Sequence, residues 1–223
     1  SLLNSLPVFA DESIYIRWAQ VMRAESTLRF LPLSDGKQPL FMWVAMPVLK
    51  IISDPLLAGR LVSAISGIMT TVGIGLAGFF LFGNLRLGLT ASLIWAVLPY
   101  AVFFDRLALA DSLLTMFIVW GFTLGLFALR RLRWDFSMLA GAALGSAWLT
   151  KSPAIFALCL LPTLILSRKK IVISLGLLLT TLVIAFSMYN ILRLGPEFHM
   201  IAIRNQDYVY PFFEVLKHPT DPL

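Results

Sequence analysis

The chain alternates between long apolar runs and short segments that concentrate its charged residues. Four runs hold about 20 or more mostly apolar residues, enough to cross the ~30 Å hydrocarbon core of a bilayer as helices. These four predicted spans are residues 59–82, 85–104, 107–130 and 171–193. A fifth apolar stretch, 136–167, is interrupted by Lys151, Ser152 and Pro153, and a proline disfavours helical geometry at the residue before it. This stretch is either one kinked helix or two short ones.

Basic clusters at both ends of the fifth stretch favour two short helices. Arg130, Arg131 and Arg133 precede it, and Arg168, Lys169 and Lys170 follow it. Because cytoplasmic loops are rich in lysine and arginine, both clusters are expected on the cytoplasmic side, together with Arg86. The stretch then crosses twice, as 136–150 and 152–167. Residues 1–58 and 194–223 are predicted to be extracytoplasmic.

The N-terminal segment predicts helices that lie at the membrane surface. From Asp11 to about Glu25, apolar residues recur at helical spacing on one side, which is typical of a helix in the headgroup plane. The residues of this apolar side are Ile14, Trp18, Val21 and Met22. Residues 41–52 are apolar but few and include Pro47, so we expect a re-entrant or juxtamembrane helix there.

Composition agrees with a multi-pass membrane protein. Hydrophobic residues make up 59% of the chain, charged residues 13%, and the mean hydropathy is +0.85, which one water-soluble core cannot accommodate. The net charge of +6 is explained by loops next to lipid headgroups, so nucleic acid is not an expected partner. Glycines 73, 75 and 78 match a dinucleotide-binding pattern, but they lie inside a predicted span with no strand before them and no βαβ unit around them, so no nucleotide site is expected there. Because the chain begins with Ser1, we expect a fragment cut at both ends.

Several charged residues occupy positions that hydrocarbon disfavours. Asp111 lies about one turn beyond Arg106 inside a predicted span, where a carboxylate costs about 2–3 kcal/mol unless it meets water or a partner. Lys151 lies between two helices too short to bring it fully to the surface. Both are either interfacial residues that pair structurally or parts of a functional cavity. The pair Asp11 and Glu12 is either a helix cap followed by an acid favoured by the helix dipole, or part of the same site.

Four motifs follow one another along the chain: Asp11-Glu12 before IYIRWAQ, GKQPLFMW at 36–43, RLALADSLLTMF at 106–117, and LGSAWLTKSPAIFAL at 144–158. Their order resembles the membrane glycosyltransferases of the dolichyl-phosphate-mannose protein mannosyltransferase superfamily, a group that includes the bacterial aminoarabinose transferase. Such proteins typically show a D-E pair, G-K-P-P-L-F-Y-W, R-x-x-x-x-D-x-x-L-T and L-T-K-G-P. The chain departs from this pattern at Gln38, which replaces the first proline, and at Ser152, which replaces the glycine after lysine. The resemblance covers most of residues 9–167.

The resemblance implies an all-α polytopic bundle of the GT-C type around an extracytoplasmic cavity, in the plasma membrane. It also implies a polyprenyl-phosphate sugar donor and an acceptor on protein, lipid or glycan. Asp11 is then the expected general base that deprotonates the acceptor hydroxyl, direct displacement inverts the anomeric centre, and Glu12 and Asp111 are supporting carboxylates. The residues expected to hold the donor phosphate are Lys37, Arg106, Lys151 and Arg204.

Three alternatives stay open at this point. A divalent metal ion could assist the reaction, although the basic residues make it unnecessary for a monophosphate, so no metal or cofactor is expected. A transporter or lipid flippase also places Asp, Lys and Arg in a midmembrane cavity among interrupted helices, and the break at Lys151 suits that class. A non-catalytic membrane scaffold, whose charged loops bind a partner, is the third.

Overall fold

The computed structural model describes residue 3, residues 6–165 and residues 170–208 of the 223-residue chain. All regular elements in these residues are helical, which confirms the predicted all-α fold. The α-helices are α1 Ala10–Ala24, α2 Leu40–Ile51, α3 Pro55–Phe82, α4 Leu85–Val97, α5 Pro99–Asp105, α6 Ala110–Arg131, α7 Trp134–Thr150, α8 Ala154–Leu160, α9 Ile171–Tyr189 and α10 Met200–Tyr208. Short 3₁₀ helices occupy Ser26–Leu28, Leu31–Asp35, Leu161–Ile165 and Asn190–Leu194.

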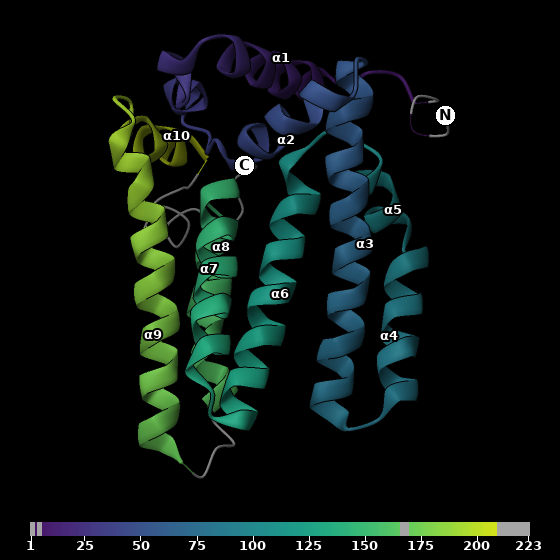
Figure 1. Ribbon diagram of the computed structural model, residues 1–223, viewed down its shortest axis with the longest axis vertical. Helices are drawn as coiled ribbons and strands as arrows, with labels where there is room; N and C mark the ends of the chain where they lie inside the picture. The colour runs from purple at the N-terminus through teal and green to yellow at the C-terminus, as the bar shows by residue number, and fades with distance from the viewer. Residues whose placement is uncertain (1–2, 4–5, 166–169, 209–223) are drawn as a thin grey trace, which may run out of the picture.

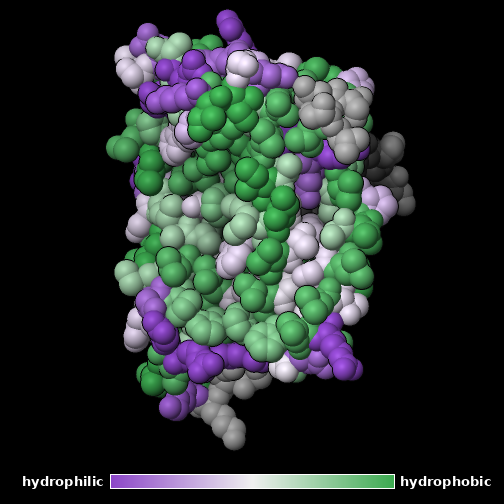
Figure 2. Space-filling model, turned by 45° about the vertical axis from the view of Figure 1, so that its right-hand side comes forward, coloured by the Kyte–Doolittle hydropathy of each residue, from purple (hydrophilic) through white to green (hydrophobic). Residues whose placement is uncertain are grey.

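The long helices run side by side as a bundle, while α1, α2 and α10 lie at one end of it (Figure 1). On the face shown in Figure 2, hydrophobic side chains cover the middle of the bundle, and polar side chains gather at its two ends. Within the described residues, α3, α6 and α9 with its extension to Leu194 are long and apolar enough to cross a membrane. The bent pair α4 and α5 passes the same test as one broken span. The molecule is therefore built as a helical membrane protein.

The ends of α3 show how local sequence sets the helix boundaries. The Asp54 carboxylate accepts hydrogen bonds from the backbone N–H groups of Leu56 and Leu57, at 3.0 and 3.2 Å, and Pro55 stands at the first helical position. Both features favour a helix start. At the other end Gly83 adopts a left-handed conformation with φ 66°, which a residue without Cβ allows at little cost. The helix therefore stops where the chain must reverse into α4.

The predicted span 85–104 is not one straight helix. Its two parts, α4 and α5, are bent by 64° at the break around Leu98. Pro99 begins α5, and Leu98 before it has the extended conformation φ −65°, ψ 118°, as expected for a residue that precedes proline. Pro99 is a local signal for this break, but it lies within an apolar run that is long enough for one span. The spans predicted at 59–82, 107–130 and 171–193 fall largely within α3, α6 and α9.

The apolar stretch 136–167 contains two helices, α7 and α8, separated at Lys151, Ser152 and Pro153. Helix α7 packs against both α6 and α9. The turns from α3 to α4 and from α6 to α7 lie at the end of the bundle opposite α1 and α2 (Figure 1). This end therefore carries Arg86 and the cluster from Arg130 to Arg133, while residues 168 and 169 lie outside the described residues.

The N-terminal helices share one hydrophobic core with the bundle. Buried residues of α1 and α2 pack with the start of α3 and with residues 107–110 and 113. The buried residues of α1 are Glu12, Tyr15, Ala19 and Met22. The buried face of α1 is therefore rotated about the helix axis relative to the predicted apolar side, which was Ile14, Trp18, Val21 and Met22. The Ile14 residue is 38% exposed. The rotation follows from the burial of Glu12, whose partners lie inside the bundle.

Candidate active site

The buried carboxylate of Glu12 fixes the start of α1 against the bundle. Its two oxygens accept hydrogen bonds from Nε and Nη2 of Arg60 in α3, both at 2.8 Å, and neither side chain is exposed. The backbone N–H groups of Phe9 and Ala108 donate to the same carboxylate at 2.9 and 2.7 Å. Arg60 also donates to backbone carbonyls that precede α1. Charge and hydrogen bonding are therefore satisfied together, as a buried ion requires.

This arrangement corrects two expectations about the acidic pair. The N-cap of α1 is Phe9, so Asp11 is not the cap, and the carboxylate that bonds the cap backbone belongs to Glu12. Burial by itself raises the pKa of Glu12, but the bonds from Arg60, Phe9 and Ala108 outweigh burial and hold this pKa below its ordinary value. Glu12 is fully buried and paired with Arg60, so its carboxylate does not reach the surface of the bundle end.

Asp11 occupies the neighbouring position and faces the other way. Successive residues of an α-helix are rotated by about 100°, so burying Glu12 turns Asp11 toward the surface of the bundle end. The Asp11 side chain is 50% exposed, and its Oδ1 lies 3.9 Å from Nζ of Lys37. The anchor at Glu12 thus presents a solvent-accessible carboxylate beside a cation.

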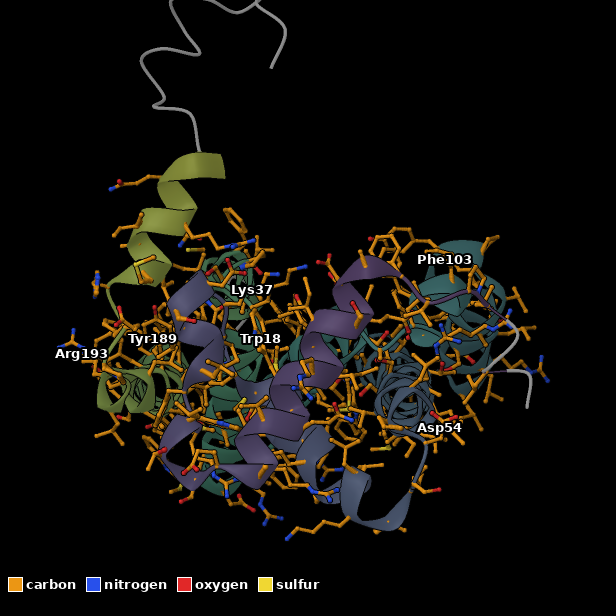
Figure 3. The ribbon with its side chains drawn as sticks, turned by 90° about the horizontal axis from the view of Figure 1, so that it is seen from above. Trp18, Lys37, Asp54, Phe103, Tyr189 and Arg193 are labelled. Atoms are coloured by element: carbon orange, nitrogen blue, oxygen red, sulfur yellow. The ribbon has the colours of Figure 1, made fainter. Side chains whose placement is uncertain are left out.

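Lys37 rests on an aromatic platform provided by α1. Its Nζ lies 5.2 Å from the ring centroid of Tyr15 and 5.4 Å from that of Trp18, and Figure 3 shows Lys37 and Trp18 close together at this end of the molecule. Such cation–π contacts attract an ammonium group to the ring face. Burial, assisted by the negative charges of Asp11 and Asp111, raises the pKa of Tyr15 to about 12. The Tyr15 hydroxyl is therefore neutral at physiological pH.

Arg204 joins the same group of charges from α10. Its Nη1 lies 2.8 Å from the Oδ1 atom of Asp35 and donates to the Asp35 backbone carbonyl at 2.8 Å. The other carboxylate oxygen of Asp35 lies 3.3 Å from Nζ of Lys37. Gly36 lies between Asp35 and Lys37 in the chain. Its backbone is left-handed, with φ 64°, and a side chain at this position would collide with Arg204. Asp35 therefore brings two cations from distant segments to one place.

Lys151 and Asp111 form the other charged pair of the region. Nζ of Lys151, at the turn between α7 and α8, donates to Oδ1 of Asp111 in the first turn of α6 at 2.8 Å. The side chains are 40% and 32% exposed, respectively. The two motif charges are thus paired with each other and still partly accessible.

Asp11, Tyr15, Lys37, Lys151 and Arg204 line one pocket of about 480 Å³ at the end of the bundle. Its walls come from α1, the loop before α2, the start of α6, the α7–α8 turn and α10. The lining residues are Asp11, Tyr15, Gly36, Lys37, Gln38, Met42, Ala110, Thr150, Lys151, Ser152, Pro153, Arg204 and Asn205. One carboxylate and three cations therefore share a cavity with both polar and apolar walls.

Three residues expected at the site are not part of its lining. Glu12 is buried beneath α1, Arg106 lies at the C-terminal end of α5, and Asp111 reaches the site only through its bond to Lys151. Arg106 was expected near the donor phosphate because it begins the motif that contains Asp111. The residues between Arg106 and Asp111, from Leu107 to Ala110, are buried in the core under α1. This burial separates Arg106 from Asp111.

Three residues that contribute to this region, Arg60, Tyr15 and Trp18, were not among those expected from the sequence. Arg60 is a charge at the second residue of the first predicted span and in the second turn of α3, and such a position signals a buried partner. Tyr15 and Trp18 stand three residues apart, the spacing that places side chains on one helix face. Neither signal identifies the partner, because Glu12 and Lys37 are distant along the chain.

The chemistry of the donor set favours anion binding by cations. Among the described residues, no group of three His, Cys, Asp or Glu side chains is placed to hold a metal ion. Lys37, Lys151 and Arg204 instead present ammonium and guanidinium groups, which are hydrogen-bond donors for phosphate oxygens. Asp11 supplies the accessible acceptor on the same wall.

Comparisons with known proteins identify the family. No curated protein and no solved structure matches the chain. A family model described as dolichyl-phosphate-mannose-protein mannosyltransferase matches residues 36–191, more than half of the sequence. The match includes Lys37, Asp111 and Lys151 and leaves Asp11 and Arg204 outside. The chain belongs to the dolichyl-phosphate-mannose-protein mannosyltransferase family, a family of membrane glycosyltransferases.

Proposed function

We propose that this protein transfers a sugar from a polyprenyl-phosphate donor to a hydroxyl group of a protein, lipid or glycan acceptor. The observation that supports the proposal most strongly is the pocket that combines Asp11 with Lys37, Lys151 and Arg204. A sugar leaving a phosphate needs a base for the incoming hydroxyl and positive charge for the departing anion. This pocket has both, with Asp11 from α1 and the cations from the loop before α2, the α7–α8 turn and α10.

In the proposed reaction, the Asp11 carboxylate accepts the proton of the acceptor hydroxyl as its oxygen attacks the anomeric carbon. The new carbon–oxygen bond forms while the bond from that carbon to the phosphate oxygen breaks. The bonding electrons leave with the lipid phosphate, and the proton on Asp11 passes to solvent. A single displacement of this kind inverts the anomeric configuration. The half-exposed Asp11 side chain is accessible to the acceptor, as a general base must be.

The cations of the pocket are proposed to hold the donor phosphate. Lys37 and Arg204 are now bridged by Asp35, and Lys151 is bridged to Asp111. Phosphate oxygens compete for the same N–H donors, and charge-assisted bonds of this type strengthen as negative charge develops on the leaving group. Asp111 is proposed to orient Lys151. Arg106 is not included, because it does not line the pocket.

The position of the pocket favours this function over transport. The pocket lies at the bundle end formed by α1, α10 and the α7–α8 turn, whereas a transporter or flippase uses a site near the membrane midplane. The pocket end also carries basic residues, among them Arg17 and Arg23. The short turns of the opposite end carry Arg86 and the cluster from Arg130 to Arg133, and on this basis we propose that the pocket is extracytoplasmic. The proposed location is the plasma membrane, with the active face outside.

The test is transfer of a labelled sugar from polyprenyl phosphate by the full-length protein, with wild type compared with Asp11→Asn. Loss of a general base typically lowers the rate by about 10²–10⁴-fold, so we expect at least about a hundredfold loss. Glu25→Gln is the matched control, because it makes the same chemical change at the C-terminal end of α1, away from this pocket. Transfer by Asp11→Asn at the wild-type rate would refute the base assignment. Failure of wild type with every lipid-phosphate sugar would refute the function.

A further inference from the structure

A direct hydrogen bond crosses the pocket wall between two residues far apart in sequence. Nε2 of Gln38, just before α2, donates to Oγ of Ser152, in the turn between α7 and α8, at 2.6 Å. Gln38 is only 5% exposed, although both residues line the pocket. A buried amide needs such a partner, because leaving it unpaired is unfavourable.

This bond joins the two loops that carry the lysines of the pocket. Gln38 directly follows Lys37, and Ser152 directly follows Lys151. Each lysine is otherwise held by a carboxylate, Asp35 or Asp11 for Lys37 and Asp111 for Lys151. None of these ion pairs connects the Lys37 loop to the Lys151 turn. The side-chain bond between Gln38 and Ser152 makes that connection.

Both residues stand at positions where the chain departs from the motif pattern described above, as Met42, in place of its tyrosine, also does. Proline at position 38 has no side-chain donor, and glycine at position 152 has no hydroxyl group. A glutamine introduced alone would bury an amide without this partner, whereas glutamine and serine together satisfy each other. In this structure the two departures meet in one hydrogen bond.

We propose that Gln38 and Ser152 are positioning residues, which set the separation of Lys37 and Lys151 so that both ammonium groups contact one lipid phosphate. This inference rests on the proposed function, because it assigns the phosphate to this pocket. The bond acts on donor binding through the lysines and does not touch the acceptor. Its loss therefore weakens donor affinity while acceptor affinity stays unchanged.

The experiment is a double-mutant cycle on the full-length protein in lipid nanodiscs, with Gln38→Met, Ser152→Ala and the double variant. Binding of polyprenyl phosphate without sugar is measured first, followed by KM for the lipid-phosphate sugar and KM for the acceptor. We expect either single change to weaken polyprenyl phosphate binding and raise donor KM by about tenfold, the loss typical of one buried hydrogen bond. The double variant should resemble a single variant, because both changes remove the same interaction.

Two further variants separate positioning from general stability. Ser152→Thr keeps the hydroxyl group and should retain donor binding. In a Lys151→Met background, Ser152→Ala should have no further effect, because the lysine that it positions is absent. A loss of folded protein changes the active fraction but not the donor KM, so these readouts are independent of stability.

Additive effects, an equal change in acceptor KM, or unchanged binding of polyprenyl phosphate would each overturn the positioning role. So would a wild-type protein that does not bind polyprenyl phosphate. A wild type that binds polyprenyl phosphate but transfers no sugar contradicts the proposed function instead. In that case the binding cycle still decides the role of Gln38 and Ser152.

Discussion

Glu12 and Arg60 form an ion pair without solvent exposure, in which two N–H groups of one guanidinium meet both oxygens of one carboxylate at 2.8 Å. The pair connects the first turn of α1 to α3. Because Asp11 directly precedes Glu12, the same pair determines where the accessible carboxylate of the pocket lies. Its removal should therefore affect stability and activity together.

Arg60→Met should destabilise the protein strongly, because it leaves Glu12 buried without its counter-charge. Loss of one partner of a buried pair costs about 3–5 kcal/mol, and we expect a large drop in unfolding temperature in detergent. The double variant Glu12→Gln/Arg60→Met should be less destabilised than the two single losses combined. Arg86→Met, at an exposed arginine, is the control. Equal stability of Arg60→Met and Arg86→Met would contradict the buried pair.

The stability of the protein should depend on Glu12 in acid. The folded-state pKa of Glu12 lies below its ordinary value of 4.5, so the unfolded chain takes up the proton first as the pH falls. The stabilisation is complete above about pH 4.5 and is lost as the pH falls through the folded-state pKa. Unfolding temperatures of wild type and Glu12→Gln, measured from pH 7 downward, should converge in acid. A constant difference across this range would exclude Glu12 as the cause.

Local signals in the sequence predicted many of the elements. The spacing of apolar residues placed a helix from Asp11 to about Glu25, where α1 spans Ala10–Ala24, and Pro153 marked the break between α7 and α8. Both depend on residues close together in the chain. Pro99 gave an equally local signal, but the apolar run around it was interpreted as one span.

Partners distant along the chain could not be predicted in the same way. Glu12 and Arg60 are separated by 48 positions, and no pattern near either residue identifies the other. The predicted topology put Lys37, Arg106 and Lys151 on one side of the membrane, but it did not indicate which side chains face the pocket. That depends on how the residues after Arg106 pack, which is decided by tertiary structure.

The aromatic platform under Lys37 should contribute to donor binding. Tyr15→Phe keeps the ring beneath Nζ and should leave donor KM within about twofold of wild type. Tyr15→Leu removes a cation–π contact worth about 0.5–2 kcal/mol and should raise donor KM by roughly three- to thirtyfold. Trp18→Leu should act in the same direction. If Tyr15→Phe were as damaging as Tyr15→Leu, the hydroxyl group and not the ring would be responsible.

Asp111 and Lys151 should behave as one unit in catalysis. Lys151→Met removes the cation proposed to bind phosphate and should raise donor KM and lower kcat. Asp111→Asn leaves the cation but releases it from its 2.8 Å contact, so the loss should be smaller. The double variant should be no worse than Lys151→Met, because Asp111 acts through the lysine. Steady-state kinetics of the three variants, with Asp135→Asn as the control at an exposed carboxylate, measure this coupling.

The two polar ends of the bundle should lie on opposite sides of the membrane, and labelling of single cysteines tests which end faces outward. Cys159 is exposed and is first replaced by serine. Thr27→Cys and Ser34→Cys report the pocket end, and Arg86→Cys and Arg131→Cys report the other, all at exposed positions. Position 132 is avoided because Leu132 has φ 54°, a conformation that side chains disfavour. A membrane-impermeant maleimide added to intact cells or spheroplasts should label the first two and reach the others only after permeabilisation. The reverse pattern would place the pocket in the cytoplasm, where the positive-inside rule disfavours it.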